Sequence, residues 1–310
     1  MHPAFSILFF TTLAGAGQGL VLCVALLTLA GVPMGAGYVS TALGVAAVLL
    51  IGGLVASFFH LGHKMRAWRA VLMWRTSWMS REVIVMPLFI ALVALWWFVA
   101  WHRPDERHTA LAWLTLGGAL LLWYCTAMIY ACLRFIQEWA HRLTIWNFVL
   151  IGAASGGTWA CVLAISQAQM PVMDWLAPWV FLLTVLAWAA RWATLVRNAG
   201  LRPRSTVQSA TGIQNARVRQ ISMGFTAGSF NTREFFHGAS DWAVRRIKWI
   251  AMTGLFVLPL ALQLLLASHV LPGVVWWIVL FAQSVGLLAE RWLFFAQANH
   301  PQNIYYQTVA

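Results

Sequence analysis

Few residues here have side chains suited to chemistry, because only 8 of the 310 residues are Asp or Glu. Two ionisable residues stand at the ends of neighbouring apolar stretches. His60 closes one stretch, and Glu82 opens the next after a polar connection. If the two stretches form antiparallel helices, the imidazole and the carboxylate lie at the same end of those helices. The sequence therefore predicts a His–Glu pair at one edge of a helix bundle.

This pair suits a reaction in which electrons and protons move together, as they do at a quinone. A quinone carbonyl needs a hydrogen-bond donor and a quinol hydroxyl needs a proton acceptor. Histidine can serve as either, since its pKa lies near neutrality. A partly desolvated glutamate can then pass the proton to water. Spacing alone slightly favours the structural alternative, an interfacial histidine beside a glutamate that extends its charge into water.

The elements that must position these residues are transmembrane helices. Hydrophobic residues make up 61% of the sequence and charged residues only 9%, against roughly 25% charged in soluble domains. A hydrocarbon core of ~30 Å needs about 20 apolar residues per helix. Eight stretches qualify, and they predict an all-α integral membrane protein with one transmembrane domain over residues 1–310: 5–30, 38–60, 82–101, 109–130, 145–167, 175–196, 249–268 and 274–297. Pro259 lies inside the seventh stretch and should kink it. Many of the 20 Trp residues lie near the ends of these stretches, as expected at lipid–water interfaces.

Glu290 lies inside the last stretch, next to Arg291. Ionisable groups at membrane depth are costly, so they usually face the bundle interior and serve a pathway or a partner. Neighbours on a helix point in different directions, so these two need not pair with each other. Structural pairing is the more common role for such a glutamate. The remaining charged groups are expected at helix ends and in loops.

A metal or haem site is not predicted in this protein. Iron–sulfur and zinc sites need closely spaced thiolates, whereas the cysteines are scattered without a CxxC motif and are expected to pack as small apolar residues: Cys23, Cys125, Cys132 and Cys161. The nine histidines include no pair deep in two facing stretches that could hold a haem. Any electron must therefore leave for a centre in another polypeptide.

Positive charge is concentrated on one side of the predicted membrane domain. Lys and Arg gather after the second, fourth and sixth stretches, and the last of these connections is a long basic loop over 197–248. By the positive-inside rule this side and both termini are cytoplasmic. A basic face that docks an acidic partner would show the same pattern, so both explanations stay open. Anionic lipid explains part of the net charge of +12. Nucleic acid is a poor explanation, because a multi-pass membrane protein has no evident groove-reading module.

The sequence resembles the membrane anchor subunits of dimethyl sulfoxide reductase-type molybdoenzymes. Their second and third helices are joined by roughly His-Leu-Gly-x-Pro-x-Arg-Ala and then Ser-x-Glu. Here the stretch is His60-Leu61-Gly62-His63-Lys64-Met65-Arg66-Ala67 and then Ser80-Arg81-Glu82, with Lys64 in place of the proline. The ending Glu290-Arg291-Trp292-Leu293-Phe294-Phe295 is also similar to the end of the family's last helix. The long loop, with Gly228–His237, resembles a subgroup similar to the membrane subunit of sulfite dehydrogenases.

The resemblance implies a quinone-linked subunit in the bacterial inner membrane, with ubiquinone or menaquinone held by His60, Arg66 and Glu82. It implies two partners, a four-cluster ferredoxin-like iron–sulfur subunit and a molybdopterin catalytic subunit acting on a sulfur compound. The basic face would dock the iron–sulfur subunit. The residues expected to take part are Lys64, Arg69, Arg75, Arg81, Arg233, Phe235 and Phe236.

Two other functions remain open at this point. A secondary transporter would have broken helices with charges at the bilayer midplane and internal repeats, and no convincing repeat is present. A purely structural anchor would need no quinone site. Replacing His60 by Leu separates a quinone site from a purely structural anchor, because only a quinone site would lose quinone-linked turnover while the complex still assembles.

Overall fold

The protein is an all-helical membrane domain. The structure, a computed structural model, describes residues 5–35, 37–59, 63–202, 204, 206–219, 221 and 241–298. Within these ranges eight helical segments are long and apolar enough to span a membrane, which confirms the predicted fold class. The elements are α1 (Phe5–Ala30), α2 (Tyr38–Phe59), η1 (Lys64–Met73), α3 (Trp78–His102), α4 (Thr109–Ala131), α5 (Arg142–Ser166), α6 (Met170–Ala199), α7 (Val207–Thr211), α8 (Asp241–Met252), η3 (Thr253–Val257), α9 (Leu258–Ala267), η4 (Gly273–Val275) and α10 (Trp276–Ala296).

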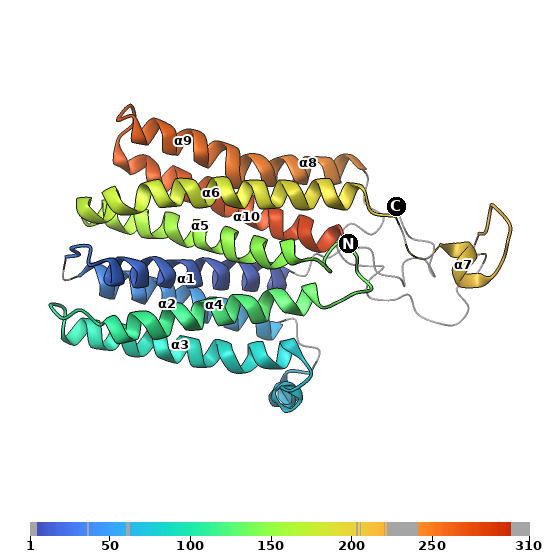
Figure 1. Cartoon of the computed structure of the whole chain (residues 1–310), viewed down its shortest axis with the longest axis horizontal. Helices are drawn as coiled ribbons and strands as arrows, with labels where there is room; N and C mark the ends of the chain where they lie inside the picture. Colours follow the sequence, from blue (N-terminus) through green and yellow to red (C-terminus); the bar gives the residue numbers. More distant parts are fainter. Residues whose placement is uncertain are drawn as a thin grey trace.

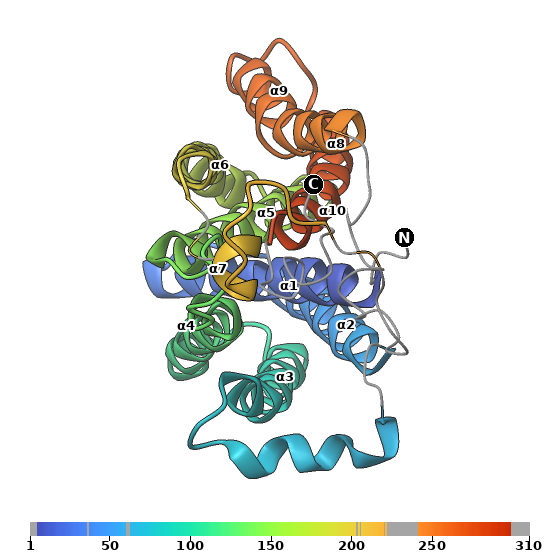
Figure 2. The same cartoon turned by 90° about the vertical axis from the view of Figure 1, so that its right-hand side faces the viewer.

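The spans run roughly antiparallel, and α1 and α5 lie in the middle of the bundle (Figure 1 and Figure 2). One flank consists of α2, α3 and α4, and the other of α6, α10 and the α8–α9 segment. Helix α1 begins and α10 ends at the same end of the bundle, on the right in Figure 1. The described basic segments after α2, α4 and α6 lie at this end too. We call it the basic end.

The two central helices touch through their backbones. Gly19 of α1 faces Gly152 and Gly156 of α5, and a Cβ atom added at Gly19 or Gly156 would overlap the backbone of the opposite helix. Small residues permit this approach, and in lipid such close packing is a main source of attraction between helices. Any side chain at these positions would therefore push α1 and α5 apart.

The seventh span, Arg245–Ala267, lies close to its predicted range 249–268. It is not one regular helix, because it is made of part of α8, then η3 and α9. Its middle part, η3, is a π-helical turn in which the Leu258 N–H donates to the Thr253 carbonyl. Pro259 follows directly, and because proline has no N–H it cannot continue the regular hydrogen-bond ladder. Gly254 of this turn packs on Gly286 of α10. The expected disturbance at Pro259 is therefore a change of helix type in the turn before it.

Helix α3 begins at Trp78, four residues before the predicted start at Glu82. Ser77 is the N-cap residue, and its side chain accepts a hydrogen bond from the Ser80 N–H. Hydropathy placed the start too late because Ser80 and Arg81 are polar, whereas a cap determines where a helix begins. Glu82 consequently lies inside the span, and not at its first residue.

Candidate functional site

Glu82 is a buried carboxylate near the basic end of the bundle. Its residue surface is only 6% exposed. The Thr126 hydroxyl of α4 donates a hydrogen bond to Glu82 Oε1 across the α3–α4 contact. The second oxygen, Oε2, keeps lone pairs with which to accept a further hydrogen bond. A buried carboxylate with an oxygen left to accept a hydrogen bond can exchange a proton.

The other two residues expected at a quinone site are placed less fully. His60 lies outside the described residues, so its relation to Glu82 stays a prediction. Arg66 lies on η1 with an exposed side chain. No ion pair within the described ranges joins its guanidinium to Glu82. The structure therefore brings together Glu82 and Thr126, a partner that sequence reasoning did not find.

Arg81, expected to dock a partner, is engaged within the protein. Its guanidinium lies 4.1 Å from the centre of the Trp78 ring. Its Nε donates to the Trp74 carbonyl at 3.0 Å, and its Nη2 donates to the Arg75 carbonyl at 2.8 Å. These bonds fix the segment that follows η1 against the first turn of α3. The arginine thus supports the element that carries Glu82.

The remaining residues expected to dock a partner divide into two groups. Arg69 and Arg75 are exposed near or on η1, and each guanidinium lies beside a tryptophan ring, at 5.6 and 5.4 Å. The others lie outside the described part of the protein: the side chain of Lys64 and residues Arg233, Phe235 and Phe236.

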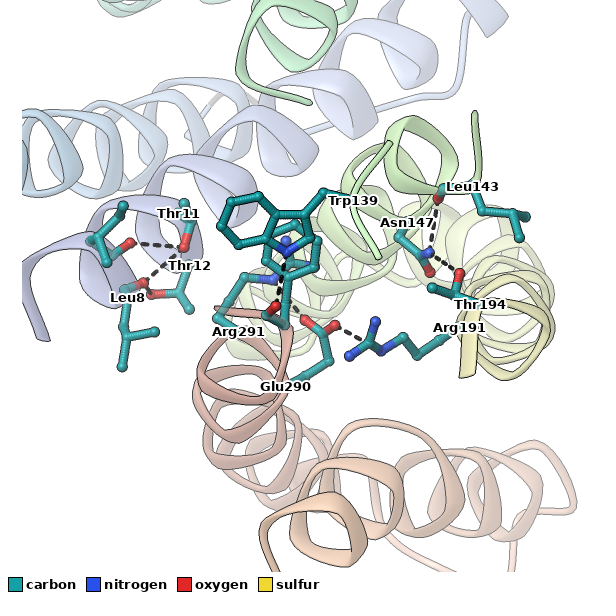
Figure 3. A network of polar contacts seen from close by, with 12 residues as sticks. Leu8, Thr11, Thr12, Trp139, Leu143, Asn147, Arg191, Thr194, Glu290 and Arg291 are labelled. Atoms are coloured by element: carbon teal, nitrogen blue, oxygen red, sulfur yellow. Dashed lines mark hydrogen bonds and ion pairs between the residues drawn. The ribbon is translucent and has the colours of Figure 1, made fainter. Parts of the chain in front are cut away.

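A buried ion triad lies deeper in the bundle, on α6 and α10 (Figure 3). Arg191 Nε is 3.0 Å from Glu290 Oε1, and Arg291 Nε is 2.7 Å from Glu290 Oε2. The three side chains are 0–3% exposed. The expectation that charges other than Glu290 and Arg291 lie only at helix ends and in loops is therefore wrong for Arg191. Adjacent residues Glu290 and Arg291 do pair, and Arg191 is a partner that the sequence did not predict.

Aromatic rings surround Arg291 and link it to the α4 side of the bundle. Its guanidinium lies 4.4 Å from the centre of the Phe148 ring and 5.5 Å from that of Phe294. Tyr130 contacts both rings, at 5.6 and 5.3 Å between centroids. Tyr130 lies one helical turn beyond Thr126, the partner of Glu82. Helix α4 therefore carries both the partner of Glu82 and one ring of the cluster beside Arg291, and the ring faces stabilise the buried cation.

The segment between α4 and α5 packs on this aromatic cluster at the basic end. Trp139, between α4 and α5, stacks on Phe294 at 5.4 Å and donates its indole N–H to the Phe294 carbonyl at 3.0 Å. Nearby, His141 caps α5, because its Nδ1 accepts from the Leu143 N–H at 3.2 Å. Burial lowers the pKa of His141, and the positive charges of Arg197 and Arg142 lower it further. The neutral imidazole is the form that can accept this bond.

A cavity of about 270 Å³ lies at the opposite end of the bundle. It is lined by Thr28 and Trp96 and by the α3–α4 connection, including Glu106 and Arg107. A ligand that bound at this end of the bundle, and not near Glu82, could occupy this cavity. In the described ranges no three His, Cys, Asp or Glu side chains come together as metal ligands.

Comparison with known proteins gives a family match over most of the length and one full-length relative. The model of the DMSO reductase anchor subunit (DmsC) family matches residues 1–296. The C subunit of the sulfite dehydrogenase of Allochromatium vinosum is 46% identical over 331 aligned positions, covering 100% of both proteins. The C component of the anaerobic dimethyl sulfoxide reductase of Haemophilus influenzae is 28% identical over 134 residues, which is 43% of this protein and 48% of that one.

Proposed function

The chain belongs to the DMSO reductase anchor subunit family, and we propose that it exchanges electrons between membrane quinone and an iron–sulfur partner in a sulfite-oxidising molybdoenzyme complex. Family membership and the eight spans make it a multi-pass membrane anchor of an oxidoreductase. The full-length similarity to the C subunit of a sulfite dehydrogenase supports sulfite as the substrate of the complex. Molybdopterin and iron–sulfur clusters would then belong to partner subunits.

The observation that carries the quinone site is the buried Glu82 carboxylate held by Thr126. Quinone supplies two-electron, two-proton redox chemistry when bound. Glu82 can take a proton from a bound quinol or return one to a quinone through its second carboxylate oxygen. Thr126 orients the carboxylate by its hydrogen bond to Oε1. We assign the complementary donor role to His60 and the recognition of a carbonyl oxygen to Arg66, as the family resemblance implies.

The basic end supports the proposed docking of the iron–sulfur subunit. Its described connections are rich in arginine, and positive potential steers an acidic partner into the correct orientation. Docking at this end would place an iron–sulfur cluster on the same side as Glu82. The positive-inside rule makes this side cytoplasmic, so the proposal places the catalytic subunits in the cytoplasm.

A comparison of two electron acceptors, a quinone and a non-quinone, tests the proposal. The assembled complex is assayed with sulfite and either a soluble ubiquinone analogue or ferricyanide, which takes electrons without using the quinone site. In Glu82→Gln, we expect quinone-linked turnover to fall by roughly 10²–10⁴-fold, the usual contribution of a positioned acid–base group. Ferricyanide-linked turnover should stay unchanged. Thr126→Val should give a smaller loss of the quinone-linked reaction alone.

Glu106→Gln is the matched control, because this glutamate lines the cavity at the opposite end. If Glu106→Gln lost quinone-linked turnover while Glu82→Gln kept it, the quinone site would lie at the opposite membrane face. Unchanged turnover in Glu82→Gln and His60→Leu, with the complex intact, would make the protein a purely structural anchor.

A further inference from the structure

The connection between α2 and α3 contains a helix that does not cross the bundle. The 3₁₀ helix η1 (Lys64–Met73) lies across the bundle axis, outside α3 and level with its first turn, as Figure 1 and Figure 2 show from two directions. Because the spans cross the bilayer, η1 runs along the membrane plane at the depth where α3 enters it. An element in this position meets headgroups on one side and acyl chains on another.

The sequence of η1 matches the three-residue period of a 3₁₀ helix. In this helix type the side chains at positions i and i+3 eclipse each other and form columns about 120° apart. One column is wholly apolar and continues into the following turn: Met65, Trp68, Val71 and Trp74. The next column holds three arginines, Arg66, Arg69 and Arg75, with Leu72 among them. The third column holds Lys64, Ala67, Ala70 and Met73.

Burial agrees with this division up to Leu72, whereas Met73, the last residue of η1 and a member of the third column, is 60% exposed. Ala67 and Ala70 are the half-buried positions among the described side chains of η1, and η1 packs on α3. In the apolar column Met65 is 91% exposed and Trp68 63%. An apolar surface as exposed as this has to be covered by lipid or by a partner protein. The arginine column is exposed as well.

We propose that η1 is an interfacial helix that binds the anionic lipid surface at the basic end, with its apolar column in the acyl region and with Arg69 and Arg75 on phosphate headgroups. A polar basic face beside Trp and Leu is the composition of helices that lie in the membrane interface. Segment 63–81 contains five Lys or Arg residues, counting Lys64 and Arg81, and no Asp or Glu. Arg69 and Arg75 are thereby assigned to lipid, and not to the docked subunit.

Two features favour lipid over a protein partner as the occupant. Helix η1 lies on the far side of α3 from the centre of the bundle (Figure 2). In a membrane domain such an outer position is the one that lipid reaches. Its apolar column is also followed by exposed apolar residues of α3, Met79 and Val83. The bonds from Arg81 to the Trp74 and Arg75 carbonyls hold the helix at this height.

Depth measurement by electron paramagnetic resonance tests the apolar column. The assembled complex, with exposed Cys132→Ser, is spin-labelled at Val71→Cys or Thr76→Cys and placed in nanodiscs containing phosphatidylglycerol. Position 71 should be relaxed more strongly by oxygen, which concentrates in acyl chains, and position 76 by a water-soluble nickel chelate. Equal exposure of both positions to nickel would overturn the proposal. Shielding of position 71 from both reagents would assign η1 to a partner subunit and would also overturn it.

Lipid selectivity tests the arginine column. The motion-restricted fraction of spin-labelled phosphatidylglycerol is compared with that of spin-labelled phosphatidylcholine around the same complex. Arg69→Gln with Arg75→Gln should lower the preference for phosphatidylglycerol, by up to about fivefold for each arginine removed. The matched control is Arg107→Gln, an arginine at the opposite end, which should leave the preference at η1 unchanged. An unaltered preference in the double variant would refute the assignment of headgroups to η1.

Discussion

The ion triad of Arg191, Glu290 and Arg291 gives the sharpest prediction about stability. Two guanidinium groups share one carboxylate at 3.0 and 2.7 Å, and all three side chains are buried. The cluster therefore carries one net positive charge. Glu290→Gln leaves two positive charges without a counter-ion, whereas Arg191→Met leaves one neutral pair between Glu290 and Arg291.

The free energies follow from this charge balance. Removing one partner from a buried pair costs roughly 3–5 kcal/mol, and Glu290→Gln removes the common partner of both pairs. We expect a cost at the upper part of that range, which lowers the folding constant by about three orders of magnitude. Arg191→Met should cost about 1 kcal/mol, the typical value for a single substitution. Removing Arg191 together with Glu290 should cost less than Glu290→Gln alone.

The assay is equilibrium unfolding of the purified subunit by SDS in mixed micelles, followed by tryptophan fluorescence. Glu106→Gln serves as the control, since its carboxylate is exposed and its pairing with Arg103 at 3.5 Å is a surface interaction. Equal destabilisation by Arg191→Met and Glu290→Gln would refute the reasoning, because charge imbalance would then not determine stability.

Two further predictions concern helix packing and pH. Gly156→Ala should prevent stable folding of the subunit, because a Cβ at this position overlaps the α1 backbone. The measurement is the yield of monodisperse protein. Gly117→Ala is the control and should be tolerated, since nothing lies within 4 Å of the added Cβ. The pKa of His141 is lowered in the folded state. The cap that its neutral imidazole provides therefore stabilises the fold fully at pH values above the ordinary histidine pKa of about 6.5. This stabilisation is lost as the pH falls through the lowered pKa of the folded state. His141→Asn keeps a capping side chain that does not titrate, and its thermal stability should fall less than that of the parent between about pH 7 and pH 5; equal slopes would contradict this role.

The spans could be predicted from sequence because the length of an apolar stretch is a local property set by bilayer thickness. The start of α3 could not, since it depends on the cap at Ser77 and not on hydropathy. This difference of one turn decides whether Glu82 lies at the edge or inside the span. The η1 helix also left a readable signal, the three-residue repeat of apolar and basic residues, which a search for helices of 3.6-residue period does not detect.

The partners within the ion triad could not be predicted from a single sequence. A lone arginine inside the sixth apolar stretch was a visible sign that Arg191 needs a buried partner. Which carboxylate it meets depends on how α6, α5 and α10 pack in space, and no local pattern specifies that. The same holds for Thr126, whose hydroxyl is one of many in the sequence and gains its role only from facing Glu82.

The depth of the buried charges argues against a transporter. Among the described residues the buried charged side chains are Glu82, Arg191, Glu290 and Arg291. At a rise of 1.5 Å per residue, these four residues lie ~6–12 Å along the helix from its basic end. The midplane of a ~30 Å hydrocarbon core lies deeper, at about 15 Å from its edge. A transporter needs charged or ion-binding groups at the midplane that both faces can reach in turn. A subunit that exchanges electrons and protons with quinone beside a docked partner needs them at one face only, and that is the distribution these four residues have.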